Sequence, residues 1–224
     1  MDTSVGSLTD QYWGQFQFCA PRLRIVLEKI HKSPQLTYRF LNTLSLLEHI
    51  GFRKILISRA KDGNAELNQR VLRHLAEESR HSFFFKRSAE NFAKRELNFS
   101  DTELLAGPAA RAYLGRLDAR TSREVRGPLK YYYMSLLVEI RAVWVYRLYK
   151  SVLSDLGLRL NLNSILAEEQ MHLQNMVFDL YKRDKAMKEC LHRLAGYEMS
   201  RFGVFLRALE RECLVHTEAS TAAE

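Results

Sequence analysis

The segments EESRH at residues 77–81 and EEQMH at residues 168–172 decide the fold of this chain. Each segment ends in a Glu-x-x-His motif, made by Glu78 with His81 and by Glu169 with His172. Residues three apart on an α-helix share one face, with Cβ atoms about 5–6 Å apart. Each pair can therefore offer a carboxylate and an imidazole to one metal ion or to two neighbouring ions. A single motif is weak evidence, because both residue types are common, but the second copy strengthens it.

A glutamate precedes each motif at the same offset, inside an otherwise apolar stretch. Glu48 lies in the run LSLLEHI, and Glu139 lies in the run MSLLVEI. The offsets are 78 − 48 = 30 residues and 169 − 139 = 30 residues. Breaks near Gly63 and at Gly157 divide each offset into two legs of similar length. At about 1.5 Å per residue, the glutamate and the motif then lie at the same height of an antiparallel helix pair. The sequence thus predicts two copies of one helical hairpin.

Long helices are predicted over most of the chain. Glycine and proline are scarce, 10 and 4 of 224 residues, which favours uninterrupted helices over many-turned β structure. Helices are expected at about residues 9–32, 33–61, 65–95, 129–156, 161–183 and 185–214, and a crossover with short helical pieces at 97–127. The order of helix pair, long crossover and helix pair is that of four-helix bundles of the ferritin-like type. We therefore expect an all-α protein with extra flanking helices around such a bundle.

One domain is expected over residues 1–224, with a metal-binding core at about 35–185 and a disordered polar tail at 216–224. No run of about 18 apolar residues could span a membrane, and the polar N-terminus does not resemble a signal peptide. The three cysteines are odd in number and far apart, which excludes a disulfide framework. These features predict a cytoplasmic protein.

Burial of the four glutamates requires compensating charge. A buried carboxylate without a partner is costly, and several facing one another are worse. Two divalent cations would balance four carboxylates, and neutral imidazoles would complete their coordination. Carboxylate and imidazole ligands suit iron or manganese, whereas zinc favours fewer ligands and often thiolate. The predicted metal ligands are Glu48, Glu78, His81, Glu139, Glu169 and His172.

This ligand pattern resembles the ferritin-like di-iron carboxylate superfamily, in which two helices each give one Glu and two others each give a Glu-x-x-His. All six positions find a match in this chain. The resemblance implies a cofactor of two iron ions, with Mn–Fe and Mn–Mn pairs as alternatives, and no catalytic residue beyond the ligands. Segment 77–81 fits the acidic-Glu-x-Arg-His form common in the oxygenase and desaturase branches. The second segment departs from that form, because Met171 stands where arginine is usual.

Residues beside the ligands could tune or enlarge the site. His74 lies four residues before Glu78 on the same face; this spacing resembles the extra-histidine set of the p-aminobenzoate N-oxygenase family, where it belongs to the last ligand helix. His74 is thus a candidate for a seventh ligand. Glu77, Glu168 and Arg80 are candidates for contacts that orient the ligands, with solvated charge as the alternative. The candidates for pocket lining are Phe85, Tyr132, Ser135, Ala142 and Tyr146.

Two functions are compatible with the predicted site. The first is an O2-dependent oxidoreductase, an oxidase or oxygenase that acts on an apolar or aromatic small molecule. The second is a metal-dependent peroxidase, catalase or ferroxidase, like rubrerythrin or manganese catalase, without an organic substrate. The net charge of +8 matches an acidic redox partner or carrier protein. Nucleic acid is disfavoured, because the basic residues are spread along the chain, and a homodimer remains an open alternative.

Overall fold

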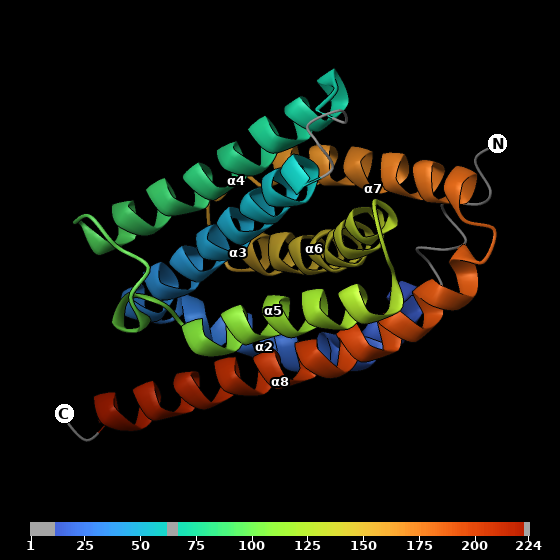
Figure 1. Cartoon of the computed structure of the whole chain (residues 1–224). Coiled ribbons are helices and arrows are strands. Elements are labelled where there is room, and N and C mark those ends of the chain that lie inside the picture. Colours follow the sequence, from blue (N-terminus) through green and yellow to red (C-terminus); the bar gives the residue numbers. More distant parts are fainter. Residues whose placement is uncertain (1–11, 62–66, 222–224) are drawn as a thin grey trace. The chain divides into compact units, whose positions relative to one another are not determined.

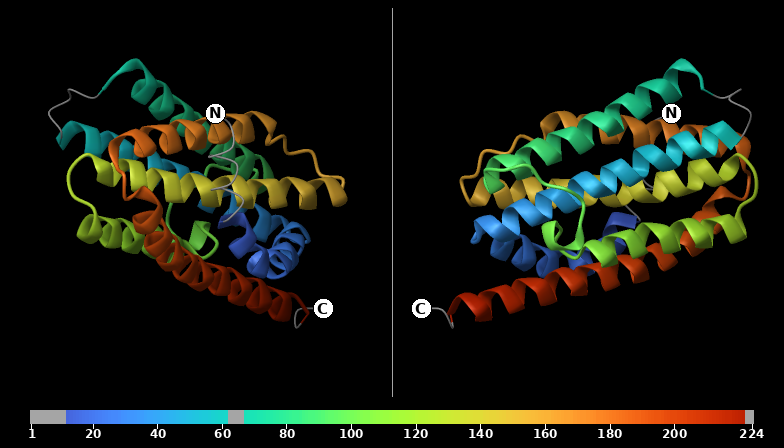
Figure 2. Two further views of the ribbon diagram at one scale, coloured as in Figure 1. Left: turned by 90° about the vertical axis from the view of Figure 1, so that its right-hand side faces the viewer. Right: turned by 60° about the vertical axis from the view of Figure 1, so that its left-hand side comes forward.

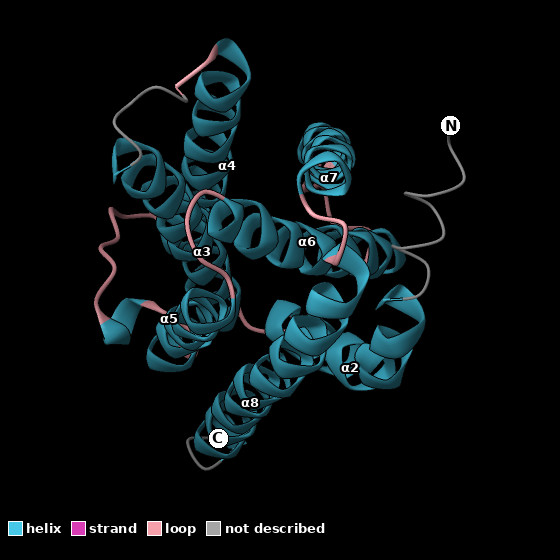
Figure 3. Cartoon of the chain, turned by 45° about the vertical axis from the view of Figure 1, so that its right-hand side comes forward, coloured by secondary structure: helices cyan, strands magenta, loops and turns pink. Residues whose placement is uncertain are grey.

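The computed structural model describes residues 12–61 and 67–221, and every regular element in these ranges is helical (Figures 1 and 3). The protein is an all-α helical bundle, as the sequence predicts. Residues 12–16 are helical and lead into the short 3₁₀ helix η1 (Gln17–Cys19). The α-helices that follow are α2 (Ala20–His31), α3 (Pro34–Lys61), α4 (Gln69–Ala93), α5 (Gly107–Glu124), α6 (Leu129–Asp155), α7 (Asn163–Arg183) and α8 (Met187–Thr221).

The described residues divide into two compact units. Unit 1 comprises residues 12–24 and 116–201, and unit 2 comprises residues 25–61, 67–115 and 202–221. The boundary falls inside α2, α5 and α8, whereas each of the two predicted hairpins lies within a single unit. The prediction of a single domain over the whole chain stays a prediction.

Helices α3 and α4 form the first hairpin, in unit 2, and lie side by side along their length (Figure 2, right). A reciprocal pair of hydrogen bonds sets their register: Ser45 Oγ donates to the Ser82 carbonyl at 2.8 Å, and Ser82 Oγ donates to the Ser45 carbonyl at 2.9 Å. Residue 45 therefore lies opposite residue 82, which brings Glu48 level with Glu78. The equal height predicted from the offset of 30 residues is confirmed for this hairpin.

Polar side chains on α3 hold the loop that follows α4. Asn42 Nδ2 donates to the carbonyls of Asn98 and Glu103, at 2.8 and 2.9 Å. Thr43 Oγ1 donates to the Leu105 carbonyl at 2.9 Å and accepts from the Leu105 amide. These buried side chains satisfy loop backbone groups that would otherwise lose their hydrogen bonds to water.

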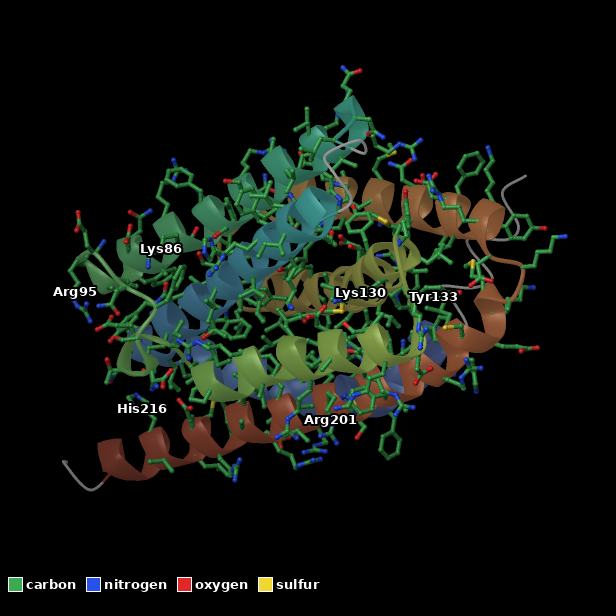
Figure 4. The ribbon with its side chains drawn as sticks, viewed as in Figure 1. Lys86, Arg95, Lys130, Tyr133, Arg201 and His216 are labelled. Carbon is green, nitrogen blue, oxygen red and sulfur yellow. The ribbon has the colours of Figure 1, made fainter. Side chains whose placement is uncertain are left out.

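The same loop is also held from its outer side (Figure 4). Lys86 Nζ donates to Asn42 Oδ1 at 3.0 Å and lies 4.4 Å from the centre of the Phe99 ring. Burial lowers the pKa of Lys86, whose ammonium group gives up part of its hydration there. Arg95 donates to both carboxylate oxygens of Glu103, each at 2.9 Å. The start of the crossover is therefore fixed against the α3–α4 hairpin.

Helices α6 and α7 form the second hairpin, in unit 1 (Figure 1). Helix α6 is buried on nearly all sides, since 15 of its residues are buried, as expected for a stretch dense in Tyr, Leu and Val. Gly157, with φ 67°, adopts the left-handed conformation that ends the helix without a Cβ clash. The chain then returns as α7, so the second predicted hairpin is confirmed as well.

A buried ion pair joins α6 to α8 inside unit 1. Arg141 Nε and Nη2 donate to the two carboxylate oxygens of Glu198 at 2.9 and 2.7 Å. The side chains are 5% and 1% exposed. The guanidinium also lies 3.5 Å from the centre of the Phe16 ring and 5.3 Å from that of Trp144. This pair sits two residues along α6 from Glu139 and fixes that part of the helix.

Two segments differ from the expectation. The crossover contains one helix of 18 residues, α5, because Pro108 follows Gly107 in the first turn, where a missing backbone N–H costs no hydrogen bond. Helix α8 continues to Thr221, beyond the expected start of a tail, and His216 Nε2 lies 2.9 Å from Ser33 Oγ. Residues 222–224 lie outside the described residues. In the ranges that the structure covers, no helix is long and apolar enough to cross a membrane.

Candidate metal centre

Unit 2 brings three of the predicted ligands together at one level of the α3–α4 hairpin. Glu48, Glu78 and His81 are 7%, 5% and 1% exposed. Each offers one ligand atom, and these atoms lie within 4.8 Å of one another. Two carboxylates and one imidazole therefore converge in a buried place, which is a cluster able to hold a metal ion.

His74 contacts this cluster through Glu78. It is 4% exposed, and its Nε2 lies 3.2 Å from Glu78 Oε1, a hydrogen-bonding distance. Since His74, Glu78 and His81 are spaced at i, i+4 and i+7, all three project from one face of α4. His74 is thus placed either to orient the Glu78 carboxylate or to act as a further ligand, and its role as a seventh ligand stays a prediction.

Gly51 leaves space for the second carboxylate oxygen of Glu78. A Cβ at residue 51 would lie 3.2 Å from Glu78 Oε2, closer than nine in ten real Cβ contacts, so the carboxylate would have to shift slightly. Gly51 is one turn after Glu48 on α3 and therefore faces the same cluster. The absence of a side chain there lets α3 approach α4 at the level of the ligands. Sequence reasoning missed this residue, although a glycine three residues after a ligand inside an unbroken helix is a recognisable signal.

A Gly51→Ala variant is expected to bind metal about tenfold more weakly, because the new methyl group displaces the Glu78 carboxylate. Alanine also favours helix over glycine by about 0.5–1 kcal/mol, so the metal-free variant should be as stable as the wild type or more so. Isothermal titration with Mn²⁺ and thermal unfolding of the metal-free chain would measure both effects. Gly196→Ala is the matched control, since nothing lies within 4 Å of a Cβ there. Equal metal affinity in Gly51→Ala and Gly196→Ala would show that residue 51 does not shape the cluster.

Unit 1 brings the other three predicted ligands together on the α6–α7 hairpin. Glu139, Glu169 and His172 are 5%, 1% and 4% exposed. His172 Nδ1 lies 3.2 Å from Glu169 Oε2 and 3.9 Å from Glu139 Oε1. This second cluster repeats the composition of the first, with two carboxylates and one imidazole, but nothing in it corresponds to His74.

The remaining predicted residues fall into buried and outer positions. Phe85, Tyr132 and Tyr146 are buried, and Ser135 and Ala142 are half-buried. Glu77 and Glu168, the neighbours of the ligand glutamates, are half-buried, and Arg80 and Met171 are exposed on the outer sides of their helices. The role of Arg80 in orienting a ligand stays a prediction.

Tyr133 is a buried polar residue near the open end of the α6–α7 hairpin (Figure 4). Its hydroxyl donates to Asp184 Oδ2 at 2.6 Å. Burial, and then this hydrogen bond, raise the pKa of Tyr133, so the phenol keeps its proton. The bond ties the C-terminal end of α7 to α6.

The residues in each cluster fit a divalent cation. Their donor atoms are carboxylate oxygens and imidazole nitrogens, the ligands that iron and manganese accept readily. Two carboxylates held close together at 7% exposure or less repel one another, and a cation between them would offset that repulsion and their lost hydration. The protein therefore has two buried His/Glu clusters, one on each hairpin, that could hold metal ions.

Comparisons of the chain with protein-family models, with curated proteins and with solved structures gave no match.

Proposed function

We propose that the two clusters hold two iron ions, and that the protein uses O2 to oxidise an organic substrate. The observation that carries this proposal is the duplication: two hairpins of the same design each bury two glutamates and one histidine at one level. Six such ligands with two cations give four negative and four positive charges. A protein that only stores or transports single metal ions would not require this balanced set of ligands in both hairpins.

Each group in the proposed centre has a defined task. Iron, when bound, would supply the redox chemistry of O2 reduction. Glu48 and Glu139 would neutralise charge from α3 and α6, and His81 and His172 would add neutral nitrogen donors. His74 would fix the orientation of the Glu78 carboxylate through its bond of 3.2 Å. The surrounding helices exclude water, since all six ligands are 7% exposed or less.

The residues near the ligands along the helices favour an apolar or aromatic substrate. Phe85 lies two turns after Glu78 on α4, and Tyr132 and Tyr146 lie two turns on either side of Glu139 on α6; all three are buried. Aromatic side chains at these positions would offer a substrate dispersion and stacking contacts rather than charge. Oxidation of a C–H bond with O2 also needs two electrons and two protons, giving the hydroxylated product and water.

Oxygen uptake measures the proposed function directly. The iron-loaded protein, reduced with dithionite that is then removed, is expected to consume about one O2 per two iron ions. In the presence of a fatty acid or an aryl amine, an oxidised organic product should form at up to one per O2 consumed, detected by mass spectrometry. Manganese-loaded protein is the comparison for the metal. Consumption of O2 without any organic product, together with rapid breakdown of added H2O2, would instead support a peroxidase or ferroxidase.

A further inference from the structure

The outer face of α4 carries three arginines in one line. Arg73, Arg80 and Arg87 are all exposed and recur every seven residues. At about 1.5 Å per residue they follow a nearly straight stripe about 21 Å long. The structure describes α4 in full; of its three glutamates, Glu78 is buried and Glu77 and Glu90 are half-buried, so exposed arginine outweighs acidic charge on this face. We call these three residues the arginine stripe; it is a positively charged surface on a single helix.

Large apolar side chains accompany the arginine stripe. Leu72 is 53% exposed and Phe83 is 63% exposed, and both lie beside the stripe on α4. Arginine and aromatic residues are enriched in protein–protein interfaces, whereas exposed apolar side chains have an unfavourable hydration free energy. A face that serves only solubility would not be expected to combine them. The composition of this surface therefore favours a protein partner.

Helix α7 provides an internal comparison for the arginine stripe. The two ligand helices correspond at an offset of 169 − 78 = 91 residues, so Arg73, Arg80 and Arg87 match Ser164, Met171 and Phe178. These three residues are also exposed, but none is charged. Because α7 forms its hairpin and buries its ligands without the arginines, the arginines are not required for that architecture. The arginines are therefore a feature that the surface of α4 has and the corresponding surface of α7 lacks.

The arginine stripe lies on the side of α4 opposite the ligands. At about 100° per residue, Glu78 points about 160° away from Arg80, and His81 about 100° away. A helix with its side chains is about 10–12 Å across. A partner bound to the stripe would therefore be separated from the Glu78 and His81 ligands by little more than the width of one helix.

We propose that the arginine stripe is the docking site of an acidic protein that carries one electron at a time. This inference rests on the proposed function. For each substrate C–H bond that is oxidised with one O2, that function needs two further electrons. Two carrier molecules would each be oxidised by one electron in successive encounters, and the metal centre would be reduced by two. Electron-transfer complexes are commonly small, burying less than about 1,200 Å² in total, which a single helix and its borders can supply. The charge pairing makes the association fast and dependent on salt.

Charge reversal of the stripe tests the docking site. The probe is a purified acidic [2Fe–2S] ferredoxin, titrated into the metal-free chain and followed by fluorescence anisotropy at about 50 mM salt. The variant Arg73→Glu/Arg80→Glu/Arg87→Glu is expected to bind it at least about tenfold more weakly than the wild type. The matched control, Arg116→Glu/Arg123→Glu/Lys188→Glu, reverses three exposed cations on α5 and α8 and should change binding by less than about twofold. Equal weakening in both variants would overturn the proposal, since net charge alone would then explain the binding.

A second variant distinguishes loss of the docking site from misfolding of the chain. Arg73→Ser/Arg80→Met/Arg87→Phe places on α4 the residues that α7 already carries at the corresponding positions. It should keep the helical circular dichroism of the wild type and still lose the ferredoxin binding. Retained binding in this variant would also overturn the proposal, and so would a stripe that binds duplex RNA or anionic vesicles but not the ferredoxin.

The proposed function is tested separately from the docking site. Wild-type protein reduced chemically with dithionite does not need a carrier, so its oxidation of a substrate depends only on the metal centre. Loss of ferredoxin binding in the stripe variants supports the docking site whatever the wild type does with O2. Absence of chemically driven substrate oxidation in the wild type would count against the proposed function alone.

Discussion

Glu78→Ala and Glu169→Ala variants are expected to hold at most about one metal ion per chain, against an expected two in the wild type, and to lose substrate oxidation at least about 100-fold. Each substitution removes a carboxylate that lies 3.2 Å from a histidine of its own cluster, so one cluster loses both a ligand and the geometry of its neighbour. Metal content by plasma mass spectrometry, after loading and gel filtration, measures the first effect. Oxygen uptake with product analysis measures the second.

The neighbouring glutamates supply the control for this experiment. Glu77→Gln and Glu168→Gln change half-buried carboxylates on the same two helices, one residue from the ligands, and should leave the metal content near two per chain. Full metal content in both ligand variants would show that Glu78 and Glu169 do not bind the ions. Loss of metal in the control variants would instead indicate that Glu77 and Glu168, on a different side of each helix, bind the ions.

An Arg141→Met variant is expected to lose about 3–5 kcal/mol of unfolding free energy, because it leaves the Glu198 carboxylate buried without its cation. For a chain of this length the loss corresponds to a fall in Tm of about 6–20 °C. The double variant Arg141→Met/Glu198→Leu should recover most of that stability, since neither charge then remains in the interior. Thermal unfolding followed by circular dichroism measures all three proteins.

Arg24→Met is the surface counterpart of this experiment. Arg24 Nη1 pairs with Asp155 Oδ2 at the same kind of distance, 2.8 Å, but the two side chains are 36% and 60% exposed. The loss of such a pair is expected to cost less than about 1 kcal/mol. If Arg141→Met were no more destabilising than Arg24→Met, burial would not be what gives the inner pair its importance.

The sequence predicts the hairpins well because their information is local and periodic. A glutamate in an apolar run, a chain break and a Glu-x-x-His at a constant offset define two antiparallel helices and the faces that they bury. The hydrogen bonds between Ser45 and Ser82 agree with this register, but nothing in the sequence around these serines predicts them. The helix at the crossover was harder, because Gly107-Pro108 reads as a break when it is in fact the first turn of α5.

The contacts that the sequence did not predict join residues distant along the chain. Arg141 and Glu198 are 57 residues apart, and no periodicity relates them. The role of Gly51 depends on how closely α3 approaches Glu78, a distance between helices that composition does not contain. The arginine stripe is readable in the sequence only after the two ligand helices are aligned with each other and their outer positions are compared.

The paired serines of the first hairpin limit how it can respond when ions enter or leave. Sliding α3 past α4 by even one residue, about 1.5 Å, would strain both hydrogen bonds between Ser45 and Ser82 at once. Sliding of α3 along α4 therefore costs more energy than rotation of the carboxylates about their side-chain bonds. Binding and release of an ion at this hairpin should therefore rearrange side chains within an unmoved backbone, without opening either helix.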